Sequence, residues 1–132
     1  MAFTLVDGEQ VRTVRVTIDT ATVITAGDFA GITAGLAVDA GATTAAIAWC
    51  PKGSATGETV CELTTGNDFT LKGTGDAVFA VAQKGTEVDL TAAQLIDVGS
   101  SSYDVLKIDI SENAGTVDST DNIVVRINKP LF

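Results

Sequence analysis

The residues with the most reactive side chains lie in one stretch, IAWCPKGSATGETVCEL (47–63), which holds Trp49 and both cysteines, Cys50 and Cys61. Strand-like runs flank a turn-rich PKGSATGE segment, so we predict a hairpin with an exposed loop at 51–58. A hairpin could bring Cys50 and Cys61 within the Cα separation of about 7 Å that a disulfide needs. The alternative is a pair of buried free thiols, as in a protein made in a reducing compartment.

Other site chemistry is incomplete in this sequence. A zinc site needs four ligands, or three and a water, and two thiols in a chain without histidine do not supply them. The glycines of GSATGET stand three residues apart and Glu58 follows, so the segment does not match a phosphate-binding loop. Without histidine there is no Ser-His or Cys-His nucleophile pair. We therefore expect no catalytic residue, no metal and no cofactor.

Trp49 has two interpretations. An exposed tryptophan beside a loop could stack on a sugar, whereas a tryptophan next to Ile47 in a strand is typically part of the core. The core interpretation is favoured, and sugar stacking remains the alternative.

The charge of the chain is strongly negative, with 17 acidic and 8 basic residues and a formal net charge of −9. Such a charge opposes nucleic-acid binding and favours high solubility. No run approaches the roughly 18 apolar residues of a membrane span, and no basic amphipathic face suits a membrane surface. The opening residues lack the features of an export signal, so we expect synthesis in the cytoplasm and no membrane partner.

Short runs of Val, Ile and Thr separated by Gly, Asp, Asn and Ser are typical of an all-β fold. We predict one compact domain over 1–132, a β-barrel or β-sandwich of short antiparallel strands. Four segments carry the prediction: a strand at 11–18, a three-stranded meander at 68–90, and strands at 103–110 and 122–128. Thr91 can cap a helical turn and Gly99 can close it, which predicts one short helix or helical turn near 91–98. Between 25 and 49, Ala and Gly show no clear period, and we expect strand only from about Thr43.

The ends of the chain carry candidate partner contacts. Arg12 and Arg15 belong to the first predicted strand, and Arg126 and Lys129 to the last, so neighbouring first and last strands would form a small basic patch. Apolar residues stand outside the clear strands, namely Phe3 near the start and Leu131 and Phe132 at the end. These ends either fold back on the core or project as contact arms at 1–8 and 129–132.

The segment GDAVFAVAQKGTEVDLTAAQLIDVGSSSYDVLKIDISENAGTVDSTDNIVVRINKPL (75–131) combines a meander, a Lys-Gly turn, an Ala-rich turn and two closing strands. In this order it resembles the decoration, or cement, proteins of tailed-bacteriophage capsids. The resemblance implies a compact β-barrel or sandwich, a homotrimer or homodimer, that binds the major capsid protein on the outer surface of the virion. It also implies that the protein bridges capsomers and has no active site.

The main alternative to a structural virion protein is a carbohydrate-binding or adhesive β module. That protein would use the 51–58 loop together with Trp49. It differs from the first interpretation in requiring an exposed indole.

Overall fold

The structure, a computed structural model, describes residues 3–8, 12–65 and 69–132 and is almost entirely β, as predicted. Its strands are β1 (Thr4–Gly8), β2 (Arg12–Thr17), β3 (Asp28–Thr33), β4 (Leu36–Asp39), β5 (Ala48–Cys50), β6 (Val60–Thr65), β7 (Phe69–Gly75), β8 (Glu87–Ala92), β9 (Leu95–Asp97), β10 (Leu106–Ile108) and β11 (Ile123–Ile127). One 3-10 turn, η1 (Val81–Gln83), stands between β7 and β8.

Five of these strands close into a barrel. They run in the order β7, β11, β10, β8 and β9, and a parallel pairing of β9 with β7 completes the ring. Side chains alternate along β7 and β11, so that Leu71 and Val125 point inward and are fully buried whereas Lys72 is exposed. β1 pairs with the first half of β7, on the edge that β9 occupies farther along.

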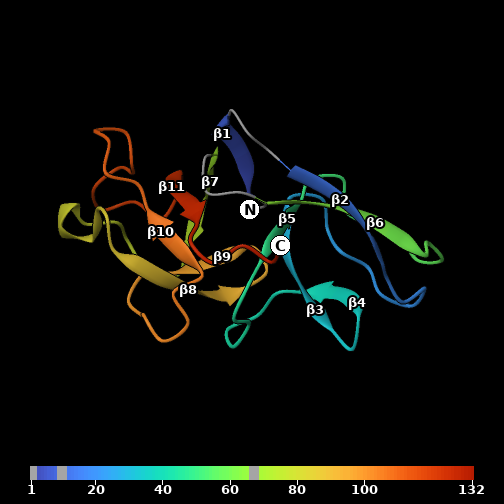
Figure 1. The fold of residues 1–132 in the computed structure, drawn as a ribbon. Coiled ribbons are helices and arrows are strands. Elements are labelled where there is room, and N and C mark those ends of the chain that lie inside the picture. The colour runs from blue at the N-terminus through green and yellow to red at the C-terminus, as the bar shows by residue number, and fades with distance from the viewer. Residues whose placement is uncertain (1–2, 9–11, 66–68) are drawn as a thin grey trace.

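The remaining strands form a second sheet in the order β2, β6, β5, β3 and β4. A parallel bridge between Ile18 and Ala37 joins the end of β2 to β4. Figure 1 shows the barrel at one side and the long β2–β6 ribbon at the other, with the C-terminus near the middle.

Two hydrophobic cores correspond to these two sheets. The larger fills the barrel and includes Phe3 and Phe29, while the smaller lies on the second sheet and includes Cys50 and Cys61. β3 faces both, because Phe29 belongs to the larger core and its neighbour Ala30 to the smaller. The two halves are also joined by a hydrogen bond of 2.8 Å from the Phe29 amide to the Ala93 carbonyl.

The helical turn predicted near 91–98 is wrong. Residues 87–92 and 95–97 are the hairpin strands β8 and β9, joined by a turn at Ala93 and Gln94. Leu90 pairs with Ile96 across this hairpin, and both side chains are buried in the barrel. Burial at period two therefore overrides the helix propensity of the Ala-Ala-Gln-Leu sequence.

The three-stranded meander at 68–90 is also wrong. Its outer runs form β7 and β8, but these strands are not neighbours, since β9 lies between them on one side of the ring. The middle run is a loop in which Phe79 makes a single bridge to Val117 and η1 follows. Only Phe79 of this run reaches the core among its large apolar side chains.

Elsewhere the strand predictions succeed where the period is clear. The 11–18 and 122–128 strands and the 47–63 hairpin are confirmed as β2, β11 and the β5–β6 pair. Strands β3 and β4 lie in the stretch where none was expected before Thr43, and the 103–110 strand is shortened to β10.

Both chain ends fold onto the body within the described residues. Residues 4–8 are β1 and therefore not an arm, and the Phe3 side chain is 1% exposed. The Phe3 ring is thus enclosed by its own chain, which corrects its assignment as a partner contact. Of the two arrangements considered for the C-terminus, the structure has the folded-back one.

Candidate partner-contact surface

The C-terminal tail is held along residue Ile47. The Ile47 amide donates to the Lys129 carbonyl at 3.0 Å, and the Leu131 amide donates to the Ile47 carbonyl at 2.9 Å. Pro130, which has no amide hydrogen, sits between these two bonds in a parallel bridge with Ile47. Leu131 and Phe132 are half-buried against the smaller core. The tail therefore closes that core and leaves part of each side chain at the surface.

Two of the predicted contact residues meet at this tail. The guanidinium carbon of Arg12 lies 5.6 Å from the centre of the Phe132 ring, in the range of a cation–π contact. Arg12 is exposed on β2, so its charge remains accessible beside the ring. The pair joins a cation and an apolar surface at one place on an acidic protein.

The other basic residues do not complete the predicted patch. Arg126 lies in β11 of the barrel, whereas Arg12 and Arg15 lie in β2 of the second sheet, so the first and last strands are not neighbours. Arg126 instead contacts Asp109 at 3.5 Å. Arg15 faces Glu62 across β2 and β6, and Lys129 is exposed next to the tail.

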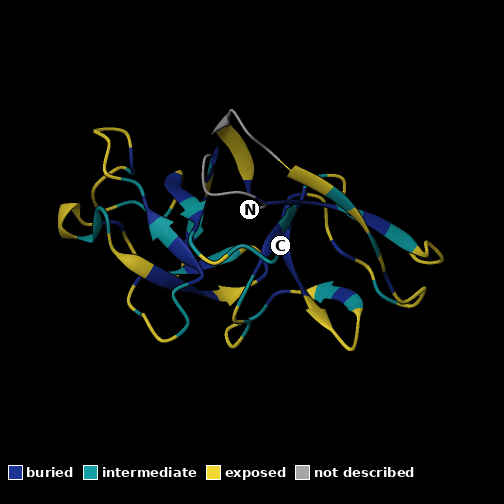
Figure 2. Cartoon of the chain, viewed as in Figure 1, coloured by how far each residue is buried: buried dark blue, intermediate teal, exposed yellow. Residues whose placement is uncertain are grey.

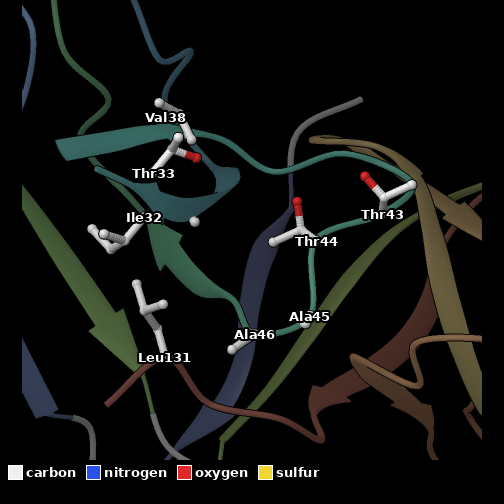
Figure 3. Close-up of a pocket in the computed structure, with 9 residues that line it drawn as sticks. Ile32, Thr33, Val38, Thr43, Thr44, Ala45, Ala46 and Leu131 are labelled. Atoms are coloured by element: carbon white, nitrogen blue, oxygen red, sulfur yellow. The ribbon is translucent and has the colours of Figure 1, made fainter. Parts of the chain in front are cut away.

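A recess of about 400 Å³ lies beside the tail, between the β3–β4 hairpin and residues 43–46. Figure 3 shows Ile32 and Leu131 at one end of the recess and Thr43 at the other. Its wall is aliphatic and hydroxyl-bearing, and no charged side chain lines it. The arrangement suits an uncharged segment of a partner protein, with apolar contacts at one end and hydroxyl groups for hydrogen bonds at the other.

A close approach of two backbone segments shapes this recess. A Cβ added at Gly31 would lie 2.9 Å from the Thr44 Cγ2 atom. Gly31 therefore lets residues 43–46 run against β3. Sequence reasoning did not find the recess, because Ile32, Thr44 and Leu131 are separated in the chain and come together only in the folded structure.

Cys50 and Cys61 are free thiols, and both are buried. Burial, and then the neighbouring Cys61, raise the pKa of Cys50 to about 11, and burial also raises the pKa of Cys61. Thiolate is the reactive form of cysteine, so both groups are held in an unreactive state at neutral pH.

We expect the native protein to resist an exposed-thiol reagent such as 5,5′-dithiobis(2-nitrobenzoate). At pH 8 the unfolded chain should titrate two thiols, and the folded chain should react at least a hundredfold more slowly because the sulfur atoms are buried. An unfolded chain with no titratable thiol would show a disulfide instead, and fast reaction of the folded chain would contradict the buried position.

Trp49 is half-buried and uses its polar atom internally. Its indole N–H donates to the Gly27 carbonyl at 3.0 Å, and its ring centre lies 6.3 Å from that of Phe69. The 51–58 loop beside it is also held in place. The Ser54 amide donates to the Ile24 carbonyl at 2.8 Å, and the Ile24 amide donates to the Ser54 hydroxyl at 3.1 Å. Stacking of a sugar on Trp49 would have to use the part of the indole that Phe69 and Gly27 leave uncovered.

Asp28 is a buried carboxylate that sequence reasoning did not single out. It faces Cys50 across β3 and β5 and is 3% exposed, and its Oδ1 atom has no hydrogen-bond partner among the described residues. Burial, and then the charge of Asp39, raise the pKa of Asp28. The charged form of Asp28 therefore destabilises the fold at neutral pH. This destabilisation decreases as the pH is lowered through the raised pKa of Asp28.

Two kinds of feature are absent from the described residues. No group of three or more His, Cys, Asp or Glu side chains is arranged to hold a metal ion. Nor is any helix in this part of the chain long and apolar enough to cross a membrane.

Comparison with known proteins adds no relative. No protein-family model matches the chain, and no curated protein and no solved structure matches it either. The function must therefore be argued from the chain itself.

Proposed function

We propose that this protein is a structural virion protein that decorates and stabilises a phage capsid. It would bind the outer surface of the major capsid protein lattice and bridge capsomers, as a homotrimer or homodimer. The observation that carries the proposal is the uncharged recess beside the tail, because it offers a concave surface lined in part by Leu131, the chain neighbour of Phe132 in the Arg12–Phe132 pair.

The rest of the molecule supports such a role. A closed barrel has few free strand edges, which suits a subunit that must stay monodisperse until it meets its lattice. The net charge of −9 favours solubility at the high concentration that a multicopy virion component needs. The identity of the partner is taken from the sequence resemblance of residues 75–131 to cement proteins; of the features behind it, the Lys-Gly turn and the two closing strands are present in the structure and the meander is not.

The recess can be tested without disturbing the core. Ile32 is 39% exposed at its rim, so Ile32→Asp places a charge where an uncharged partner segment would bind. We expect at least a tenfold loss of affinity for phage shells in a co-sedimentation assay, because an unpaired charge in an interface is costly.

Val23→Asp is the matched control for this experiment, since Val23 is 49% exposed and does not line the recess. It should bind shells like the unmodified protein, and both variants should keep its melting temperature. Shell binding of Ile32→Asp at the unmodified affinity would show that the recess is not the contact surface.

A further inference from the structure

Half of the large hydrophobic side chains that the structure exposes gather on two loops of the barrel. We call this surface the apolar end, and its members are Val78 (49% exposed), Val81 (58%), Ile110 (75%) and Val117 (52%). The loops are residues 76–86 and 109–122, and Figures 1 and 2 show them at the side of the barrel farthest from the β2–β6 ribbon. The apolar end is therefore a different surface from the recess beside the tail.

The two loops are locked to each other through Phe79. Its amide donates to the Ser119 carbonyl at 2.9 Å, and its carbonyl accepts from the Asp118 amide at 3.1 Å. Its ring is buried against Gly115, where an added Cβ would lie 2.7 Å from the ring. Gly115 thus allows the Phe79 ring to pack closely against the second loop. The bridge between Phe79 and Val117 then holds Val117 near Val78, the residue that precedes Phe79.

A second set of bonds fixes the other two members. The Gly85 amide donates to the Ile108 carbonyl at 2.9 Å, which holds the end of the first loop beside Ile110. Within the loop, the Lys84 amide bonds to the Val81 carbonyl at 3.1 Å and closes η1. The apolar end is preorganised, so a partner that binds it need not order it first.

Acidic side chains outnumber basic ones around this apolar surface. Over residues 76–87 and 109–122 the sequence has six carboxylates and one lysine, and two further cations, Lys107 and Arg126, line a recess together with Ile110. Asp76, Glu112, Asp118 and Asp121 are among the exposed ones. An apolar centre with a charged rim is the usual composition of a protein interface, and the rim selects the sign of the partner.

We propose that the apolar end is a second docking surface, and that its occupant is a basic protein surface with Lys or Arg around an apolar recess. A second copy of this chain is disfavoured, because two acidic rims would repel each other when the same ends meet. The inference does not depend on the capsid assignment, since it follows from the apolar end alone.

The test uses a defined probe, a basic amphipathic peptide of Leu and Lys. The ¹H–¹⁵N spectrum of the full chain should show amide shifts confined to 76–86 and 109–119 as this peptide is added. The affinity should fall as salt is raised, because the rim contribution is screened. A Leu and Glu peptide of the same length should not bind.

Variants separate this surface from the overall negative charge. Val81→Ser with Ile110→Ser should weaken peptide binding at least tenfold, because two aliphatic contacts are lost while the rim is unchanged. Val23→Ser is the control, as it removes a valine that is 49% exposed from the connection between β2 and β3. It should leave the affinity unchanged.

Two results would overturn the inference. One is a set of amide shifts spread over the whole acidic surface, with equal affinity for the double variant and the control. The other is a dimer of the unmodified protein in sedimentation velocity that Val81→Ser with Ile110→Ser converts to monomer, which would make a second copy the occupant. Loss of shell binding by Ile32→Asp tests only the recess beside the tail and does not bear on the apolar end.

Discussion

Phe3→Ala is expected to destabilise the protein by about 3–5 kcal/mol, the usual cost of removing a buried phenylalanine. The Phe3 ring centre lies 4.2 Å from that of Phe29, and an added Cβ at Gly73 would lie 2.4 Å from the Phe3 ring. The barrel wall has a glycine at the place that the ring occupies, so no other side chain fills the space when the ring is removed. Such a loss is a large fraction of the stability of a typical domain.

Urea unfolding with linear extrapolation measures this change. Leu5→Ala is the control, because Leu5 is 49% exposed on β1 and its loss should change stability by no more than about 0.5 kcal/mol. Equal stability of Phe3→Ala and Leu5→Ala would show that the N-terminal residues are an arm after all.

Asp89→Ala is expected to cost about 2–4 kcal/mol, because hydrogen bonds to a buried charged group are among the stronger ones. The Asp89 carboxylate is 3% exposed on β8 and accepts backbone amides of Ser102, Tyr103 and Asp104 at 2.7–3.0 Å. It also accepts the hydroxyl of Ser100 at 2.9 Å. One side chain therefore organises the whole 100–104 loop, and its removal leaves these donors without a partner.

The same carboxylate makes stability depend on pH. Burial alone would raise the pKa of Asp89, but the hydrogen bonds from Asp104, Tyr103, Ser100 and Ser102 outweigh it and lower the pKa below 3.8. The stabilisation is thus complete above the unfolded pKa of about 4 and is lost as the pH falls through the lowered folded value.

The difference in unfolding free energy between the unmodified protein and Asp89→Ala should therefore shrink only below pH 4. Glu112→Ala, an exposed carboxylate, serves as the control and should show little effect at any pH. A difference that stays constant from neutral pH to pH 3 would contradict the role of the charged form.

Much of the fold follows from local patterns in the sequence. Alternation identified β2, a short Val- and Ile-rich run identified β11, and turn residues between two strand-like runs identified the β5–β6 hairpin. Where alternation was absent, as in the Ala- and Gly-rich stretch of β3 and β4, these strands depend on pairing with distant residues and were missed. The 91–98 segment failed for a related reason, since Leu90 and Ile96 are placed by the barrel and not by local propensity.

The candidate sites were less predictable than the fold. Arg12, Leu131 and Phe132 were identified from composition, but the recess also needs the close approach of Gly31 to Thr44 and the tail held along Ile47. Three members of the apolar end, Val78, Val81 and Ile110, fell in segments predicted to be strands, 68–90 and 103–110. Those runs leave the barrel at Asp76 and after Ile108, where the ladders end.

The central claim is that this chain binds a phage capsid lattice from outside. The most direct measurement is co-sedimentation of the purified protein with shells of a tailed phage from its source, with the solution mass recorded in the same run. The account predicts saturable pelleting at a fixed copy number per shell. Failure to pellet with both immature and expanded shells would contradict it.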